Sequence, residues 1–523
     1  MLESQWMMVP MPMLPHQQRT RSWDEVLLGL DEQAVRDEAE RCLQCGHPLC
    51  VVGCPNHNPI PTFIGLVQEG RYVEAAAADY LHNALASCTG RVCSWETQCE
   101  GHCVLTARGE GVRVGAIERF IADYALTHPE AFDAARQRIR EAVDATGSFP
   151  ADFPYTGLVT AYRSTEEEDR PDWMGQSDRT LEGCEVAVVG AGPAGLACAD
   201  FLRRRGVAVT VLEAGDRAGG LLCDGIPQFV LPEEVVDREV ARLRREGIVF
   251  RFGVALGREV DLDALREAFD AVFVAIGAGR ARTLGIPGED AHGVWTAQAF
   301  LHQAKVALSD PAVTPPEVGQ HVLVIGAGNT AMDAARTALR LGATDVRIVY
   351  RRTRAESPSR AIEIDHATEE GVSFDYLVLP VALVKDADGK LTGAVLQRME
   401  LGEPDASGRR RPVPVPGSEV VLPCDTVIQA VGYSVAGDQL GHPEALAKGG
   451  WVQADTESGG RTAVPGVFAG GDDVRGPATV VEAVHDGRLA AAAIAAYLAE
   501  TRSTEVAERS RDPKTMSSTA VGA

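Results

Sequence analysis

The sequence predicts an α/β protein in which a helical, cysteine-rich domain precedes two Rossmann-like nucleotide-binding domains, the second inserted into the first. Three observations carry this expectation: two motifs with seven cysteines between residues 42 and 103, two strand–glycine turn–helix units, and a late return to a strand and glycine turn near residue 470. The expected parts are 1–150 (helical domain), 151–182 (linker), 183–289 and 425–500 (outer nucleotide domain), 290–424 (inserted nucleotide domain) and 501–523 (disordered tail).

The bulk composition limits the kinds of partner. The 523 residues carry a formal net charge of -24, which argues against nucleic acid or an anionic membrane as the main partner. Residues 1–22 lack the basic start and apolar core of a signal peptide, and the longest apolar run, near 489–499, is too short to span a bilayer. We therefore expect a cytoplasmic protein with no membrane or nucleic-acid partner, whose cysteines serve metal or redox chemistry.

The cysteines of the helical domain fall into two compact groups. RCLQCGHPLCVVGCP is followed by RVCSWETQCEGHC, and the proline after the fourth cysteine is typical of ferredoxin-like runs. Closely spaced thiolates on short loops are the ligands that iron–sulfur clusters need. A structural zinc ion remains the alternative, although it usually takes two C-x2-C pairs or added histidines. The cysteines concerned are Cys42, Cys45, Cys50, Cys54, Cys93, Cys99 and Cys103.

Helical periodicity surrounds these cysteines. Residues 31–42 predict a helix that is capped by Asp31 and delivers Cys42 at its end. Residues 63–81 and 115–127 predict further helices that pack around the cysteine groups. Residues 1–22, rich in Met and Pro, predict an extended arm.

The first nucleotide unit begins at Cys184. An apolar strand is followed by G-x-G-x-x-G and a helix, and the next strand ends in an acid that can bind a ribose hydroxyl. The glycines allow the turn, the approach of a pyrophosphate and close helix–strand packing. The residues expected at this site are Gly190, Gly192, Pro193, Ala194, Gly195, Glu213, Gly220 and Gly277.

The second unit, VLVIGAGNTAMD, repeats the pattern with Gly326, Gly328, Asn329 and Thr330 at the turn. Its second strand ends in Tyr350, Arg351 and Arg352, with no acid. A carboxylate there would repel a 2′-phosphate, whereas guanidinium groups can bind it, so we expect NADPH at this unit. The alternative is that both arginines are ordinary solvated surface charges.

The chain then returns to the first unit. DTVIQAVGY predicts a strand of the outer domain, and GVFAGGDD predicts a strand exit followed by a helix near Thr479. A carboxylate at Asp472, after Gly471, can bind a flavin ribityl chain, and the helix N-terminus favours the negative charge of reduced flavin. The first unit is therefore expected to bind FAD.

Together these motifs resemble the small (β) subunit of NADPH-dependent glutamate synthase. The same family includes the large subunit of NADH-dependent ferredoxin:NADP transhydrogenase and the amino-terminal half of dihydropyrimidine dehydrogenase. The resemblance covers roughly residues 25–500. It implies FAD, NADPH and two [4Fe–4S] clusters. One cluster would be held by Cys42, Cys45, Cys50 and Cys103, the other by Cys54, Cys93, Cys99 and Glu118.

The function implied by the resemblance is electron entry. Hydride passes from NADPH to FAD, and the clusters carry single electrons to a partner subunit, which forms glutamate from glutamine and 2-oxoglutarate in glutamate synthase. No side chain of this chain is expected to be a catalytic residue. Alternatives are a transhydrogenase-type or dihydropyrimidine dehydrogenase-type electron-entry subunit, a non-catalytic assembly subunit, and a flavin-dependent disulfide reductase. The last would need a redox thiol near the flavin, for which Cys223 is the candidate while Cys198 and Cys424 are expected in the core.

Overall fold

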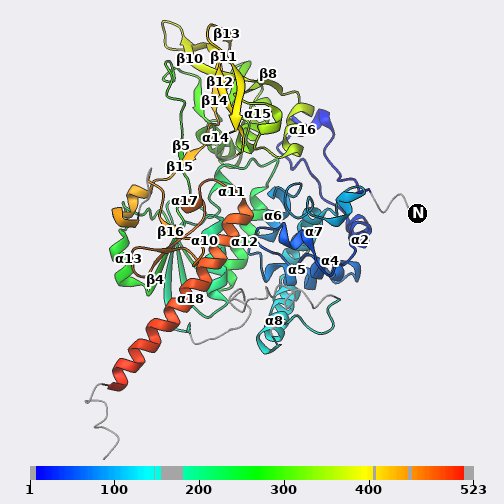
Figure 1. The fold of residues 1–523 in the computed structure, drawn as a ribbon, viewed down its shortest axis with the longest axis vertical. Helices are drawn as coiled ribbons and strands as arrows, with labels where there is room; N and C mark the ends of the chain where they lie inside the picture. The colour runs from blue at the N-terminus through cyan, green and yellow to red at the C-terminus, as the bar shows by residue number, and fades with distance from the viewer. Residues whose placement is uncertain (1–6, 147, 155–180, 405–407, 446–449, 512–523) are drawn as a thin grey trace, which may run out of the picture.

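The computed structural model describes residues 7–146, 148–154, 181–404, 408–445 and 450–511. In Figure 1 the helical domain (blue) lies to the right, one nucleotide domain (green to yellow) at the top and the other at the lower left. The predicted α/β architecture, with a helical domain and two nucleotide domains, is confirmed.

Short helices build the amino-terminal domain. The helix predicted after Asp31 is confirmed as α2, and the Asp31 side chain accepts a hydrogen bond from Ala34 N. The arm before it is not simply extended, because it contains the one-turn helix α1 and a bridge between Met13 and Leu27. The helices are α1 (His16–Arg19), α2 (Glu32–Glu40), α3 (Leu49–Val52), α4 (Ile60–Gln68), α5 (Tyr72–Tyr80), α6 (Ala86–Val92), α7 (Val114–Thr127) and α8 (Pro129–Thr146).

The outer nucleotide domain is a seven-stranded sheet in the order β16-β17-β18-β4-β1-β2-β3. The strands from β18 to β3 run parallel, which places their carboxyl ends at one edge. The strands are β1 (Glu185–Val189), β2 (Ala208–Glu213), β3 (Val249–Phe252), β4 (Ala271–Val274), β16 (Ala454–Asp455), β17 (Arg461–Thr462) and β18 (Val467–Ala469). The helices are α10 (Pro193–Arg203), α11 (Leu221–Asp224), α12 (Glu233–Arg245), α13 (Leu262–Ala268), α17 (Asp472–Arg475) and α18 (Val480–Arg511).

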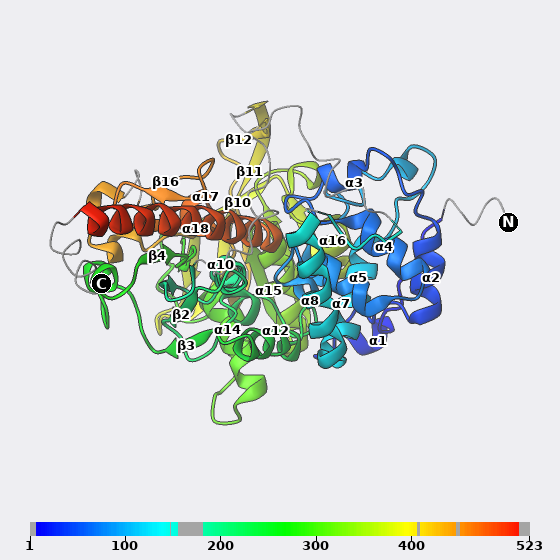
Figure 2. The ribbon, with the colours of Figure 1, turned by 90° about the horizontal axis from the view of Figure 1, so that it is seen from below.

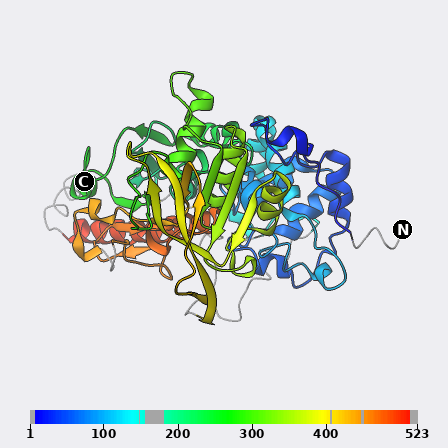
Figure 3. The same ribbon diagram turned by 90° about the horizontal axis from the view of Figure 1, so that it is seen from above.

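The inserted domain has a five-stranded parallel sheet in the order β6-β14-β7-β8-β9 and a four-stranded antiparallel sheet, β10–β13. Figure 3 shows these sheets from above, beside the helical domain. The strands are β6 (Val294–Thr296), β7 (His321–Ile325), β8 (Asp345–Tyr350), β9 (Ser373–Tyr376), β10 (Val378–Lys385), β11 (Leu391–Pro404), β12 (Arg410–Pro414), β13 (Val420–Pro423) and β14 (Thr426–Gln429). The helices are α14 (Ala297–Ser309), α15 (Asn329–Arg340) and α16 (Ala361–Glu369).

Two sequence expectations are corrected here. The strand in DTVIQAVGY was assigned to the outer domain, but β14 pairs with β6 and β7 of the inserted domain. The chain returns only afterwards, where β15 (Tyr433–Ser434) pairs with β5 (Arg280–Ala281) between the two domains. An apolar strand followed by glycine fits either sheet equally well, so the pattern alone could not decide.

The second correction concerns the carboxyl terminus. Residues from 501 were predicted to be disordered, but α18 continues through Arg511 as one helix. Its first half packs along α10, as Figure 2 shows, because Gly487 has no side chain to collide with the Ala194 carbonyl. Residues 512–523 and most of the predicted linker lie outside the described residues.

Within the described residues, no helix combines the length and apolar character needed to cross a bilayer.

Candidate functional site

A cavity of about 460 Å³ lies where the two nucleotide domains and the helical domain meet. Glycine turns of both nucleotide units line it, together with Tyr433 from the crossing between the domains. Because turns from both nucleotide units border this one space, two nucleotides could meet in it.

The first glycine turn has the geometry that its motif predicts. Gly190 has a φ of 105°, and a Cβ there would overlap the Ala275 carbonyl. Gly192, the N-cap of α10, has no atom within 4 Å of its Cβ position, so its backbone faces open space. Gly195 lies outside the cavity lining, because it packs against the Gly190 carbonyl. A pyrophosphate could therefore approach the amino terminus of α10.

Carboxylates flank this turn. Glu213 accepts hydrogen bonds from Ala191 N and Gly215 N, both at 2.8 Å, which hold its carboxylate at the carboxyl end of β2. Asp472 begins α17 and lines the same cavity, and burial raises its pKa to about 6. The predicted residues that line the cavity are Gly190, Gly192, Pro193, Ala194, Glu213, Gly220, Gly277, Asn329, Thr330, Gly471, Asp472 and Thr479.

The second unit opens into the same space. Asn329 and Thr330 line the cavity, while Gly326 (φ 127°) and Gly328 form the turn behind them. The two predicted arginines have different surroundings. Arg351 is exposed, whereas Arg352 is 5% exposed and its Nε donates to the Arg410 carbonyl at 2.7 Å. Of the pair, Arg351 is therefore the one whose side chain is open to a bound phosphate.

The seven cysteines and Glu118 form two groups of four. Cys42, Cys45, Cys50 and Cys103 make up the outer group, in which each thiol is partly exposed, and burial, with the charge of Cys103 as a further contribution, raises the pKa of the other three. The inner group consists of Cys54, Cys93, Cys99 and Glu118, which line one small buried cavity of about 10 Å³. The structure thus brings together the two ligand sets that the resemblance implies.

Glu118 is fixed by neutral donors. Asn58, Asn83 and Thr89 donate to its Oε1 at 3.2, 2.7 and 3.1 Å. Burial raises the pKa of Glu118 to about 7, although these hydrogen bonds oppose the shift. The sequence analysis did not identify these three residues, and only the N-x-N spacing of Asn56 and Asn58 after the cysteine–proline pair could have drawn attention to one of them.

The thiol groups fit a multinuclear metal centre. Burial first, and then neighbouring thiolates, raise the pKa of Cys42 to about 11 and of Cys50 to about 12. Burial and the Glu118 carboxylate likewise raise the pKa of Cys54 to about 11. Such thiols give up their protons when a metal core supplies the balancing positive charge. In the described part of the chain, no three His, Cys, Asp or Glu side chains converge closely enough to hold a metal ion without adjusting their positions.

A thin wall separates the inner group from the nucleotide cavity. Val92 and Ser94 line the nucleotide cavity, while Cys93 between them lines the inner cavity. From the other side, Thr479 and Val480 line the nucleotide cavity and Val481 lines the inner one. At the end of α6 and at the start of α18, neighbouring residues therefore line the nucleotide cavity on one side and the inner cavity on the other.

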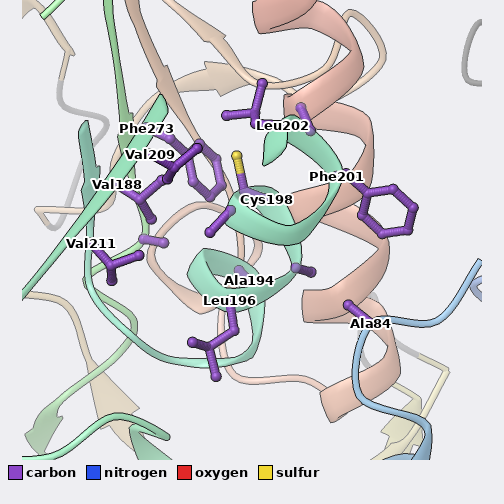
Figure 4. Close-up of a cluster of buried hydrophobic side chains, with 14 of the residues drawn as sticks. Ala84, Val188, Ala194, Leu196, Cys198, Phe201, Leu202, Val209, Val211 and Phe273 are labelled. Atoms are coloured by element: carbon purple, nitrogen blue, oxygen red, sulfur yellow. The ribbon is translucent and has the colours of Figure 1, made fainter. Parts of the chain in front are cut away.

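The remaining cysteines lie in the core. Figure 4 shows the Cys198 sulfur among Leu202, Val209 and Phe273, in the cluster between α10 and the sheet. Cys223 is 3% exposed and its thiol donates to the Ala218 carbonyl at 3.4 Å. Burial raises the pKa of Cys223 to about 11, opposite to what a reactive thiol needs.

Other polar residues of the cavity were not predicted. Tyr433 hydrogen-bonds with the Thr330 side chain, and burial raises its pKa. Arg360 lines the cavity, stacks 4.3 Å from the Trp95 ring and pairs with Glu96 at 3.3 Å. No local sequence pattern predicts such residues, because each interacts with a partner that is far away in the sequence.

Comparison with known proteins identifies the family. The profile of the family "Pyridine nucleotide-disulphide oxidoreductase" matches residues 184–487, and the profile "Dihydropyrimidine dehydrogenase domain II, 4Fe-4S cluster" matches residues 19–130. The glutamate synthase [NADPH] small chain of Escherichia coli is 37% identical over 93% of this chain and 96% of its own length. The chain belongs to the glutamate synthase small-chain family. The expected resemblance and oxidoreductase class are thereby confirmed.

Other members of the family differ in length. The putative oxidoreductase AegA of E. coli is 40% identical over 92% of this chain, which spans 68% of AegA. Among solved structures, FprA of Mycobacterium tuberculosis in complex with NADPH shares the fold, with a TM-score of 0.51 and 22% identity over 62% of this chain and 86% of FprA. This likeness supports the α/β fold of these domains.

Proposed function

We propose that this protein is the electron-entry subunit of an NADPH-dependent oxidoreductase of the glutamate synthase type. It would bind FAD, NADPH and two [4Fe–4S] clusters and deliver electrons to a partner subunit that makes glutamate from glutamine and 2-oxoglutarate. The single observation that carries the proposal is the wall shared by the nucleotide cavity and the inner group. When bound, FAD accepts a hydride and returns electrons one at a time, and iron–sulfur clusters accept single electrons.

The protein supplies binding, orientation and electrostatics. Gly192 and the amino terminus of α10 would bind the FAD pyrophosphate, and Glu213 and Asp472 the hydroxyl groups of the ribose and ribityl chain. The amino terminus of α18 faces the same cavity, so its dipole favours negative charge on the flavin ring. Asn329, Thr330 and Arg351 would bind NADPH. The inner and outer groups would hold one cluster each.

The surface around the outer group supports the proposal of a protein partner. Leu43, Leu49, Val52 and Val104, which flank its cysteines, are 39–56% exposed. Residues 42–68 contain no acidic side chain, lysine or arginine, although charged residues make up 24% of the chain. An uncharged apolar rim around a redox site fits a stably bound partner better than one steered by charge. We therefore place the exit of electrons at this face.

The proposal is tested with anaerobically purified protein. Iron and acid-labile sulfide should each approach about eight per chain. NADPH should bleach the flavin absorbance and produce iron–sulfur EPR signals, and NADH should do so more slowly. Protein that contains zinc in place of iron, or flavin that NADPH leaves oxidised, would contradict the proposal.

A further inference from the structure

One face of α18 points at the inner group. Val481, His485 and Arg488 follow one another at helical spacing, and Val481 lines the inner cavity. His485 lies 6.3 Å from the ring of His57, which follows Cys54 in the chain. The same helix begins at the nucleotide cavity. Arg488 therefore lies about two helical turns from Val480 and Val481, which line the two cavities.

Arg488 is buried and held in place by two histidines. Its side chain is 4% exposed, and Nη1 and Nη2 donate to Nδ1 of His82 at 3.3 Å and Nδ1 of His485 at 3.4 Å. A guanidinium can only donate, so both Nδ1 atoms must be unprotonated acceptors. Burial, and then the charge of Arg488, lowers the pKa of His485 to about 3 and that of His82 well below its ordinary value. The positive charge of this cluster therefore stays on Arg488.

That charge acts on a proposed cluster ligand. Burial lowers the pKa of Arg488 to about 10, and the nearby Cys54 opposes this shift. Arg204 also faces Arg488, but it is paired with Asp200 at 2.5 Å. Three other charged groups, Glu118, Asp79 and Arg360, also act electrostatically on Cys93 of the inner group.

We propose that Arg488 is a positioning residue that sets the reduction potential of the cluster at the inner group, by stabilising its reduced form. Reduction adds one negative charge to the cluster, and a fixed cation in a poorly screened interior favours the state with more negative charge. Two neutral imidazoles hold the guanidinium without neutralising it, so its field reaches the cluster. The inference rests on the proposed function, specifically on an iron–sulfur cluster bound by Cys54, Cys93, Cys99 and Glu118.

The test is an EPR-monitored redox titration with dithionite and mediators, which needs neither NADPH nor a partner. In Arg488→Gln, the ratio of reduced to oxidised inner cluster at a fixed potential should fall about tenfold, which is a shift of about 59 mV for one electron. The outer cluster should titrate as in the wild type. Arg488→Lys, which keeps the charge, should restore most of the wild-type ratio. Arg502→Gln, fourteen residues further along the same helix, about 21 Å away, should change neither cluster.

The outcomes separate the two claims. Wild-type protein without any cluster signal would refute the proposed function. Intact clusters with an unchanged inner potential in Arg488→Gln would refute the role of Arg488 alone. If Arg488→Gln fails to retain iron, Arg488→Lys decides: a loaded protein with the wild-type ratio supports the inference, and a loaded protein with a tenfold lower ratio overturns it.

Discussion

Glu118 shows how a single residue acquires its role from distant parts of the chain. It lies on α7, but the donors that fix its carboxylate come from the loop after Cys54 and from the segment around α6. Seven cysteines cannot complete two four-ligand sets, and Glu118 supplies the eighth side chain at the inner group. A carboxylate of this kind is invisible to a search for cysteine spacing.

The two ligand sets predict different effects for two buried cysteines. Cys99→Ala should lower the iron content from about eight to about four per chain, because one of two clusters loses a ligand. Cys88→Ala, on α6 and in the core, is the matched control and should retain all the iron. Iron and sulfide analysis with EPR of the reduced protein measures both. Equal losses in the two variants would contradict the assignment.

The two arginines after β8 predict separate consequences. Arg351→Ala should lower kcat/KM for NADPH roughly 10- to 100-fold, since a charge-assisted hydrogen bond contributes about 1.5–3 kcal/mol, and leave NADH oxidation unchanged. Arg352→Ala should alter thermal stability instead, because its Nε binds the Arg410 carbonyl. Steady-state rates with both coenzymes decide this. An unaltered preference for NADPH in Arg351→Ala would count against the proposed phosphate contact.

At the scale of elements, the amino-terminal arm and the residues that join it to α2 connect all three domains. Arg19 pairs with Glu369 of α16 at 2.6 Å, and Glu25 pairs with Arg91 of α6 at 3.0 Å. Val26 N donates to the carbonyl of Phe229, whose ring lies between Trp23 and the guanidinium of Arg340. The arm therefore fixes the inserted domain relative to the other two.

This junction predicts a large effect of Phe229→Ala. The side chain is 1% exposed, so its removal should cost about 3–5 kcal/mol and loosen the inserted domain. Calorimetry should show that the first unfolding transition moves to a lower temperature and separates from the remaining transitions. Phe374→Ala, on the half-buried edge strand β9, is the control and should shift the transition less. A single, unshifted transition in Phe229→Ala would disagree with this account of the arm.

At the scale of the molecule, a buried ionic network joins the helical domain to the outer nucleotide domain. Arg242 of α12 pairs with Asp200, Glu239 and Glu246 and donates to the Ala84 carbonyl at 2.7 Å. Tyr80 and Ser87 of the helical domain donate to Glu239. Burial alone would raise the pKa of Asp200, but Arg204, Arg242 and Arg136 outweigh it and hold the pKa well below its ordinary value. The network holds α5 and the start of α6 against α10 and α12.

Arg242→Met should therefore destabilise the protein by about 3–5 kcal/mol at neutral pH, because it leaves buried carboxylates without their cation. Chemical denaturation of the loaded protein measures the free energy of unfolding. Arg244→Met, two residues away and exposed, should change it by less than about 1 kcal/mol. Equal stability of the two variants would argue that the network carries little of the domain contact.

The local sequence was sufficient to predict the features that depend on interactions between neighbouring residues. The turn around Gly190, the cap at Asp31 and the start of α18 after Thr479 follow from backbone conformations and hydrogen bonds within a few residues. The sheet to which a strand belongs was not determined locally, since β14 pairs within the inserted domain. The burial of Arg352 depends likewise on a distant strand, β12. The continuation of α18 beyond residue 501 could not be predicted from apolar periodicity either.

The sequence by itself determined the α/β class, the two glycine turns and the supply of thiols, because these depend on residue types at fixed spacing. Only the tertiary structure decided that one of the two sets is buried and the other partly exposed, and that α18 brings Arg488 beside the buried one. The reason is physical. Electrostatic and packing interactions depend on distances in space, and the fold brings Cys54 and Arg488 together although most of the chain separates them.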